Sequence, residues 1–386
     1  MCATQSYGVI PKKLYSYKTV EVISSDLNSF KLVKKDNFVI SLRSFEGGIE
    51  HSNYQGIISP AYTILEPQVE IYSFYFKFLF KSSFFISTLN IHKIGIREGQ
   101  NISYASLQYT PIPLPPLQEQ KEIAEFLDKK CEKIQNYINK KQKLITLLQE
   151  KKQALINEAV TKGLNPNIES KNSGIEYLGL IPHHWEVRRV ATLGKFFKGS
   201  NISKNDLQDS GVCVVLYGDI YTKYEIKTKQ FQSKIAENFA KDKTQILCGD
   251  LLFSGSGETK EDIGKCICYL GNEKAYVGGD VIVLRQMGQD SLFLSYVLNS
   301  DYIKYQKAVI SKGEIIIHIY ASNLRDLKIP LPPLQEQKEI AAFLDSKVAQ
   351  IDSVIEKTKK QIELIKEYKN TLINEAVCGR INLERK

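Results

Sequence analysis

The sequence predicts an α+β protein in which two globular α+β domains alternate with two long repeated helices. These helices are expected to pair as an antiparallel coiled coil with pseudo-two-fold symmetry. Three observations lead to this prediction: a direct repeat, a heptad spacing of apolar residues in both copies, and β-branched and aromatic runs between Gly and Ser turns elsewhere. Residues 113–160 align with residues 330–377 without a gap at a constant offset of 217, and 30 of the 48 aligned positions are identical. An insertion would rotate the buried face of a long helix, so the absence of gaps indicates helix.

The repeat divides the chain into four expected segments. Residues 1–112 form a first globular domain and residues 113–165 the first repeated helix. Residues 166–329 form a second globular domain, and residues 330–386 the second repeated helix with a short basic tail. The domains also resemble each other weakly, because Asn37–Ser41 resembles Asp250–Ser254 and residues 76–86 resemble residues 293–303.

Each repeated helix has a clear beginning. Two consecutive prolines (residues 115–116 and 332–333) precede it, and proline suits the first turn because its φ is fixed and it needs no donor there. Glu119 and Glu122 follow near the N-terminus of the first helix, where negative charge is favourable. At about 1.5 Å per residue, a helix of about 46 residues spans roughly 70 Å.

Apolar residues recur at alternating steps of three and four in both helices, which is typical of a coiled-coil seam. The first seam comprises Leu127, Cys131, Ile134, Ile138, Ile145, Leu148, Leu155 and Ala159, with Lys141 and Lys152 interrupting it. The second comprises Leu344, Val348, Ile351, Ile355, Ile362, Ile365, Leu372 and Ala376, with Thr358 and Lys369 interrupting it. We expect the two helices to pack on each other as a rigid spacer, with the globular domains at opposite ends. The alternative is that each helix packs only on its own domain.

Composition indicates an ordinary globular protein, and its charge is compatible with a polyanionic partner, although many proteins with neutral partners are equally basic. The chain has 386 residues, 43% of them hydrophobic, and a formal net charge of +9, which is compatible with nucleic acid. No apolar run approaches the ~20 residues that span a bilayer. The seven cysteines are scattered and no export signal is visible, so reduced thiols in the cytoplasm are expected. Neither the cysteines nor the five histidines have metal-site spacing, and no metal or cofactor is expected.

Three features together resemble the specificity subunit of type I restriction–modification enzymes. They are the twin Pro-Leu-Pro-Pro-Leu-Gln-Glu-Gln helices, the lead-in segment Ser173–Trp185, and Gly218–Thr222. The resemblance implies two target-recognition domains that each read one part of a split double-stranded DNA site. It also implies that the helices set the spacing between the parts and dock two methyltransferase subunits, with restriction (translocase) subunits joining for cleavage.

One departure concerns the first domain. Asp250 lies 76 residues after Gly174, whereas the matching Asn37 lies only 36 residues after Met1, and no lead-in segment precedes it. The first recognition domain is therefore expected to be truncated at its N-terminus.

Readers of base sequence need polar and basic side chains on loops. In the second domain the candidates are Lys198, Ser200, Asn201, Tyr221, Lys223, Ser254, Lys260 and Lys312. In the first domain they are Arg43, Ser44, His51, Arg97 and Asn101. Each of these residues also has a purely structural explanation. The lysines can be merely solvated, the tyrosines can belong to the core, and the glycines of these loops can serve turn geometry.

Catalytic motifs are weak. Ser254–Lys260 lacks the spacing of a phosphate-binding loop, and no Gly-x-Gly-x-x-Gly motif opens a helix. The two acidic residues Asp219 and Glu225, followed by Lys227, loosely resemble the acidic–acidic–lysine cluster of metal-dependent nucleases. We therefore expect a non-enzymatic subunit that reads DNA and assembles a complex. Two alternatives stay open: a scaffold or defunct subunit that binds protein only, and a self-contained DNA nuclease.

Overall fold

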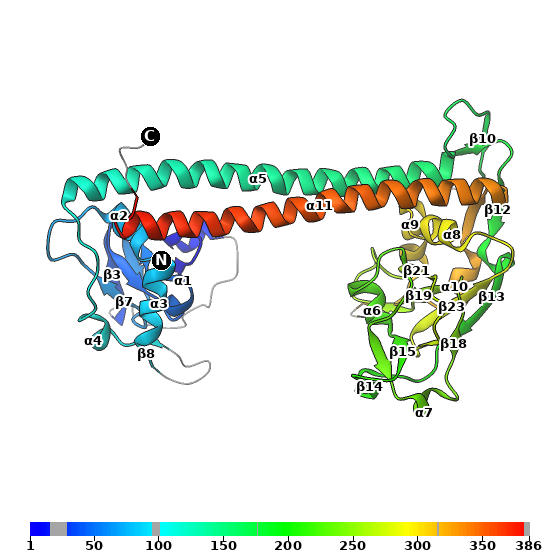
Figure 1. Ribbon diagram of the computed structural model, residues 1–386, viewed down its shortest axis with the longest axis horizontal. Helices are drawn as coiled ribbons and strands as arrows, with labels where there is room; N and C mark the ends of the chain where they lie inside the picture. The colour runs from blue at the N-terminus through cyan, green and yellow to red at the C-terminus, as the bar shows by residue number, and fades with distance from the viewer. Residues whose placement is uncertain (16–28, 95–100, 176, 315, 382–386) are drawn as a thin grey trace. The chain divides into compact units, whose positions relative to one another are not determined.

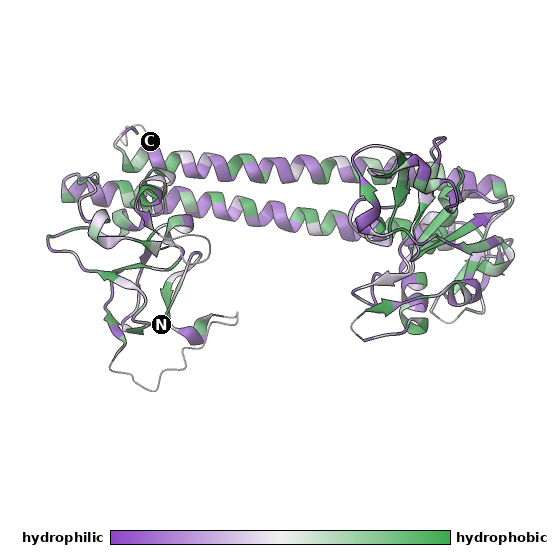
Figure 2. Cartoon of the chain, turned by 90° about the horizontal axis from the view of Figure 1, so that it is seen from below, coloured by the Kyte–Doolittle hydropathy of each residue, from purple (hydrophilic) through white to green (hydrophobic). Residues whose placement is uncertain are grey.

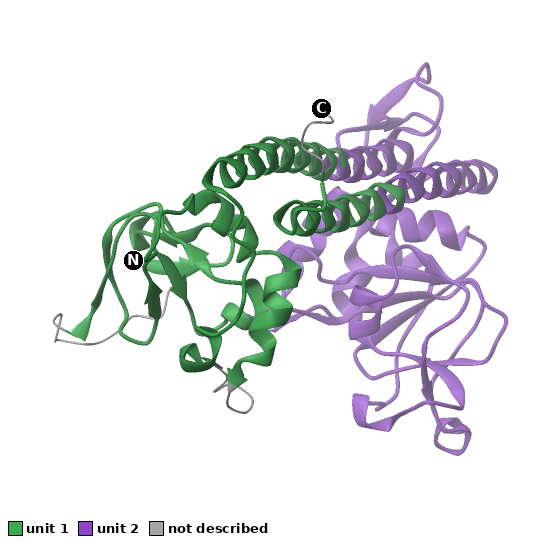
Figure 3. Cartoon of the chain, turned by 60° about the vertical axis from the view of Figure 1, so that its left-hand side comes forward, with its two compact units in different colours: residues 1–144, 357–386 green, residues 145–356 purple. Residues whose placement is uncertain are grey.

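The structure is a computed structural model that describes residues 1–15, 29–94, 101–175, 177–314 and 316–381 (Figure 1). It divides into two compact units (Figure 3). Unit 1 comprises residues 1–144 and 357–386, and unit 2 comprises residues 145–356. No helix in the described part of the chain combines the length and the apolarity needed to cross a membrane.

Two long helices contribute to both units. They are α5 (Leu117–Lys162) and α11 (Leu334–Val377), and each begins directly after its pair of prolines, as predicted. Within unit 2 the end of α5 packs on the start of α11, since Ile156 and Val160 share a core with Ile340 and Leu344. In unit 1 the start of α5 lies beside the end of α11 (Figure 3). The helices therefore run antiparallel, and the predicted α+β fold with two long helices is confirmed.

Apolar segments recur along both helices between polar ones (Figure 2). Every predicted seam residue is buried or half-buried. Of the interrupting residues, Thr358 is 4% exposed and therefore lies inside the seam. Lys152 reaches out of the seam, and its Nζ lies 2.8 Å from Asp352 Oδ1 on α11 and 3.0 Å from Glu225 Oε2.

The globular part of unit 1 is built from short strands around a small core. A three-stranded sheet has the order β5-β4-β7, and β1–β2, β3–β6 and β8–β9 are two-stranded. Val9, Val33, Val39 and Ile58 form one apolar cluster. The strands are β1 (Cys2–Thr4), β2 (Gly8–Ile10), β3 (Lys31–Val33), β4 (Phe38–Ile40), β5 (Glu50–His51), β6 (Gly56–Ile58), β7 (Thr63–Leu65), β8 (Lys93–Ile94) and β9 (Asn101–Ile102). The short helices are α1 (Ser44–Gly47), α2 (Ser73–Leu79), α3 (Ser83–Ile91) and α4 (Tyr104–Leu107).

Unit 2 contains two five-stranded sheets, with orders β13-β23-β19-β21-β16 and β14-β17-β15-β22-β18. Its principal strands are β12 (Glu186–Arg189), β13 (Gly194–Lys198), β14 (Leu207–Gln208), β15 (Val212–Val215), β16 (Lys227–Thr228), β17 (Ser233–Ile235), β18 (Gln245–Ile246), β19 (Leu251–Ser254), β21 (Cys266–Tyr269), β22 (Ala275–Val277), β23 (Val281–Gln286) and β25 (Lys328–Leu331). Two-stranded pairs are formed by β10 (Ser170–Asn172) with β11 (Leu180–Pro182), β20 (Ser256–Gly257) with β24 (Ile317–His318), and β12 with β25. The helices are α6 (Tyr217–Thr222), α7 (Glu237–Ala240), α8 (Ser291–Leu298), α9 (Asp301–Ile310) and α10 (Ala321–Asp326).

A buried glutamine connects the start of each long helix to the short helix before it. In unit 1, Gln120 accepts a hydrogen bond from Tyr72 N (2.8 Å) and donates to Pro115 O (2.8 Å). In unit 2, Gln337 accepts from Asp290 N (3.0 Å) and donates to Pro332 O (2.8 Å). Tyr72 and Asp290 are the N-caps of α2 and α8, so each glutamine ties a long helix to a short one.

A repeated asparagine makes a second connection near the end of each long helix. Asn374 on α11 accepts from Phe84 N in the first turn of α3, at 3.2 Å. Asn157 on α5 accepts from Asp301 N in the first turn of α9, at 3.0 Å. Each globular part is thus attached to the start of one long helix and to the end of the other.

The weak resemblance between the domains also has a structural counterpart. Asn37 precedes β4 and accepts a hydrogen bond from Lys34 N at 2.8 Å. Asp250 precedes β19 and accepts from Leu247 N, also at 2.8 Å. A pair of short helices then follows in each unit, α2–α3 in unit 1 and α8–α9 in unit 2. Both domains therefore share the turn that precedes the strand and the pair of helices.

The glutamine connection yields a stability prediction. Gln337→Leu leaves Asp290 N and Pro332 O without their buried partner, so we expect unit 2 to lose about 2 kcal/mol of unfolding free energy. Gln335→Leu, on the exposed face of the same turn, is the matched control and should change little. The fluorescence of Trp185, the single tryptophan and fully buried in unit 2, reports urea unfolding. Equal losses in both variants would contradict the assignment.

Lys152 and Lys369, which interrupt the two seams at the same repeat position, yield a second prediction. Burial disfavours the ammonium of Lys152, but hydrogen bonds with Asp352 and Glu225 outweigh it and raise the pKa of Lys152. Lys152→Met should therefore cost about 1 kcal/mol, because both acidic partners are partly exposed. Lys369 holds the equivalent position and forms no ion pair with a described residue, so Lys369→Met should be neutral or stabilising. Thermal unfolding followed by circular dichroism compares them, and a reversed order would refute this reading.

Candidate nucleic-acid interface

Strand ends in unit 2 bring several predicted loops to one place. In the first five-stranded sheet, β23 runs antiparallel to both β13 and β19, with Lys198 opposite Ile282 and Ser254 opposite Val281. The ends of β13 and β19 and the start of β23 therefore share one edge. In the second sheet, β15 and β22 run parallel and end at Val215 and Val277.

Backbone hydrogen bonds join these loops into one surface. Gly278 N donates to Val215 O at 2.9 Å, and Gly255 N donates to Asp280 O at 2.8 Å. Ile319 N donates to Gly255 O at 3.0 Å. We call this surface the loop face and define it by residues 199–201, 216–218, 255–257, 278–280 and 317–320.

Glycine is required where two of these loops meet. A Cβ at Gly199 would lie 1.9 Å from the carbonyl oxygen of Gly278, so only glycine permits this approach. The turn at residues 278–280 contacts the neighbouring loops on both sides, although it is not among the residues predicted from the sequence. Its Gly-Gly-Asp composition between two apolar strands was the available signal.

The loop face and its edge carry polar, basic and aromatic groups. Lys198 is two-thirds exposed at the edge, with its Nζ 3.8 Å from Asp280 Oδ1, and Asn201 is also exposed. Ser200 is partly engaged, because its Oγ accepts a hydrogen bond from Thr244 N at 2.7 Å. The rings of Tyr217 and Tyr320 are exposed as well. These side chains offer hydrogen-bond donors, a cation and stacking surfaces to a ligand.

His318 lies at the centre of a small polar group on this face. Its Nδ1 is 3.0 Å from Ser256 Oγ, and its ring stacks on Tyr320 with a centroid distance of 6.5 Å. Its backbone exchanges two hydrogen bonds with the exposed Lys312, which is therefore held beside the loop face.

The other predicted residues of the second domain lie on α6 and in the following loops. Lys223 is engaged within the chain, with its Nζ 2.8 Å from Asp219 Oδ1 and 3.1 Å from Ser233 Oγ. Tyr221 is half-buried, and burial raises the pKa of its hydroxyl. Lys260 is exposed and forms no ion pair with any described residue.

Three predicted contacts lie inside the protein and are corrected. Ser254 is fully buried and its hydroxyl donates to Ser256 O at 2.8 Å. Ser44 is 1% exposed and its hydroxyl accepts from Ser41 N at 2.8 Å. His51 is 4% exposed and pairs with Asp36 at 3.0 Å. Ser254 and His51 lie at strand ends and Ser44 at a helix start, and in each case the side chain points into the protein. There it stabilises a turn or the core instead of facing a ligand.

The remaining predictions for the first domain concern three residues. Arg43 is exposed at the N-terminal end of α1 and forms no ion pair with the described part of the chain. Asn101 begins β9. Arg97 lies outside the described residues.

The residues of the nuclease alternative do not converge. Asp219 pairs with Lys223, Glu225 with Lys152, and Lys227 with Asp345 on α11. Among the described residues, no group of three or more His, Cys, Asp or Glu side chains could hold a metal ion. Each carboxylate is instead used by a separate ion pair.

Buried titratable groups in both units serve structure. Lys307 is 1% exposed, and its Nζ donates to the carbonyl oxygens of Gly264 (2.5 Å) and Leu298 (2.7 Å). Burial lowers the pKa of Lys307 to about 8. In unit 1, burial raises the pKa of Glu50 to about 7 although Lys81 is paired with it.

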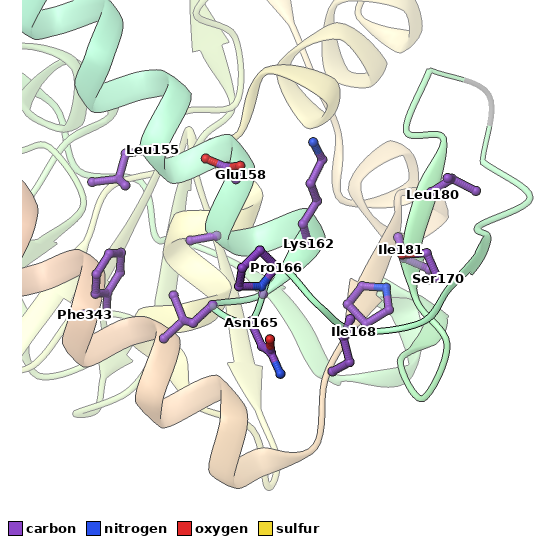
Figure 4. Close-up of a pocket in the computed structure, with 14 residues that line it drawn as sticks. Leu155, Glu158, Lys162, Asn165, Pro166, Ile168, Ser170, Leu180, Ile181 and Phe343 are labelled. Carbon is purple, nitrogen blue, oxygen red and sulfur yellow. The ribbon is translucent and has the colours of Figure 1, made fainter.

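A groove of about 540 Å³ lies between the end of α5, the start of α11 and the β10–β11 hairpin (Figure 4). Leu155, Ile168 and Phe343 contribute to its apolar lining, and Glu158 and Lys162 are the charged residues there. The lining is therefore mainly apolar packing surface, with two charged side chains from the last turns of α5.

Comparisons with known proteins agree on one family. Residues 7–149 and 182–364 match the family described as type I restriction modification DNA specificity domain. The type I restriction enzyme MjaVIII specificity subunit of Methanocaldococcus jannaschii is 30% identical over 281 residues, which cover 71% of this chain and 62% of that protein. The putative type I restriction enzyme MjaX specificity subunit of the same organism is 28% identical over 307 residues, covering 76% and 65%. The chain thus spans less than two thirds of the length of these relatives.

Solved structures show the same fold. One, from a study of complex assembly and conformational transition of the type I R-M system, superposes with a TM-score of 0.71 at 17% identity, covering 91% of this chain and 84% of that one. The HsdS subunit from Thermoanaerobacter tengcongensis gives a TM-score of 0.53 at 18% identity, covering 91% and 83%.

Proposed function

The chain belongs to the type I restriction–modification DNA specificity family, and on this premise we propose that it is the DNA-recognition subunit of such a system. It would bind a bipartite double-stranded DNA site and contribute no catalytic group itself. The observation that carries the proposal is the pair of equivalent attachments, through Gln120 with Asn374 and Gln337 with Asn157, that holds two different globular parts on one repeated frame.

We propose that the globular segments 1–112 and 166–329 each read one part of the site. The loop face supports this for the second segment, because it presents Asn201 and exposed tyrosines, with Lys198 at its edge and Lys312 beside it. Lysines neutralise phosphates, whereas amide side chains can form paired hydrogen bonds with base edges. Ser200, Tyr221, Lys223 and Lys260 are proposed at its periphery. Arg43, Arg97 and Asn101 are the proposed contacts in the first segment.

The repeated helical segments 113–165 and 330–386 are proposed to set the spacing between the half-sites and to dock the partner subunits. A direct repeat presents the same residues twice, which favours two copies of one partner. We propose that this partner is the methyltransferase subunit, and that restriction subunits join the resulting complex. The proposed location is the cytoplasm, where the seven free thiols would stay reduced.

The proposal is tested by mapping methylated adenines in the genome of cells that express the chain with its methyltransferase subunit. A split, asymmetric motif is expected if both segments read DNA. Formation of the complex without any new motif would instead support the protein-only scaffold. Metal-dependent cleavage by the purified chain alone would contradict the proposed role.

The loop face yields a prediction about specificity. Asn201→Ala should relax the methylated sequence in one half-site only, because it removes a base-reading group from one domain. Lys198→Ala should weaken binding of the assembled complex to all sequences and reduce the salt dependence by about one phosphate contact.

Lys195→Ala is the matched control, because Lys195 is an exposed lysine three positions earlier on β13, away from the loop face. Binding at several salt concentrations and the methylation map measure the three variants. An equal loss for Lys195→Ala and Lys198→Ala would remove the loop face from the DNA interface.

A further inference from the structure

In unit 2 the segment Ile181–Val187 packs between the end of α5 and the start of α11. Trp185 is fully buried, and its indole N–H donates to Glu336 Oε1 at 3.1 Å near the start of α11. A Cβ at Gly163, just beyond the end of α5, would lie 3.3 Å from the indole ring. The tryptophan therefore fills the space between the end of one long helix and the start of the other.

The residues after Trp185 form a strand on the segment that leads into α11. β12 pairs antiparallel with β25, with Val187 opposite Pro330 and Arg188 opposite Ile329. The pairing tolerates Pro330 within β25. It buries Ile329 completely and leaves Leu331 only 9% exposed.

Unit 1 repeats most of the parts that receive this segment, although Pro111 stands where unit 2 has Lys328 in β25. Ile112-Pro-Leu114 repeats Ile329-Pro-Leu331, and Glu119 repeats Glu336. Gly379 follows α11 with φ +69° and lies one position before the repeat counterpart of Gly163, which follows α5 with φ +76°. The hydroxyl of Tyr75 lies 3.4 Å from Pro113 O and 2.9 Å from Val377 O, so the Ile-Pro-Leu segment and the end of α11 meet.

No described residue fills this place in unit 1. Residues 111–114 belong to no strand (Figure 1), and Ile112 and Leu114 are 38% and 58% exposed. Glu119 is exposed too. No heavy atom of the described residues, chain neighbours aside, lies within 4 Å of the position that a Cβ at Gly379 would take. We call residues 111–114, Glu119 and Gly379 the acceptor face.

We propose that the acceptor face binds, as an added antiparallel strand, an extended segment of another polypeptide with the pattern Ile-Pro-X-X-Trp-X-Val. The pattern is that of Ile181–Val187, which occupies the equivalent place in unit 2. Main-chain hydrogen bonds to residues 111–114 supply affinity, and burial of the tryptophan beside Glu119 supplies specificity. The inference stands apart from the proposed function, because it requires neither DNA nor a methyltransferase.

The test uses the full chain and a fluorescein-labelled peptide of its own residues 178–190, followed by fluorescence anisotropy. We expect saturable binding that weakens about tenfold or more when the peptide carries Trp185→Ala. Equal affinity of the two peptides, or no saturation, would overturn the proposal.

Variants of the chain locate the binding site. Ile112→Asp and Glu119→Ala should each weaken peptide binding several-fold, whereas Glu122→Ala, an exposed acid on the first turns of the same helix, should not. Circular dichroism checks that the variants remain folded. If Glu336→Ala weakens binding and Glu119→Ala does not, the peptide exchanges with the segment of unit 2, and the acceptor face is refuted.

Discussion

Four buried or half-buried amide side chains on the two long helices hold the globular parts in place. An amide can accept and donate at once, so Gln120 and Gln337 each join a proline carbonyl before the long helix to the first backbone N–H of a short helix. Asn374 and Asn157 supply acceptors for the next short helix in each unit. Buried N–H groups at a helix start are costly when unpaired, so these contacts fix where each short helix can begin.

This arrangement separates the two long helices and their attached helix pairs, which the units share, from the strands and loops, which differ between the units. The helix pairs α2–α3 and α8–α9 attach to the repeated helices, whereas the strands beyond them differ between the units. In unit 2 the strand ends of two sheets meet through Gly255, Gly278 and Asp280, and they present polar loops away from the core. Loops on a rigid scaffold can change their residues without changing the packing below them.

The two units differ in how the approach to each long helix is covered. In unit 2, β12 covers β25 and Trp185 closes the gap beside Glu336. In unit 1, the same Ile-Pro-Leu segment keeps its apolar side chains exposed. An exposed extended segment with apolar side chains is a site where another chain can add a strand.

The sequence by itself determined the α+β class, the two long helices, their starting residues and the burial of both seams. These properties depend on residue spacing along one helix, and a gap-free repeat exposes that spacing directly. It also placed the candidate loops around residues 198–201 and 254–260. Only the tertiary structure decided that Ser44 and Ser254 point inward, that Lys223 is paired with Asp219, and that the turn at 278–280 joins the loops. The physical reason is that burial and pairing depend on strands distant in sequence, which local patterns do not specify.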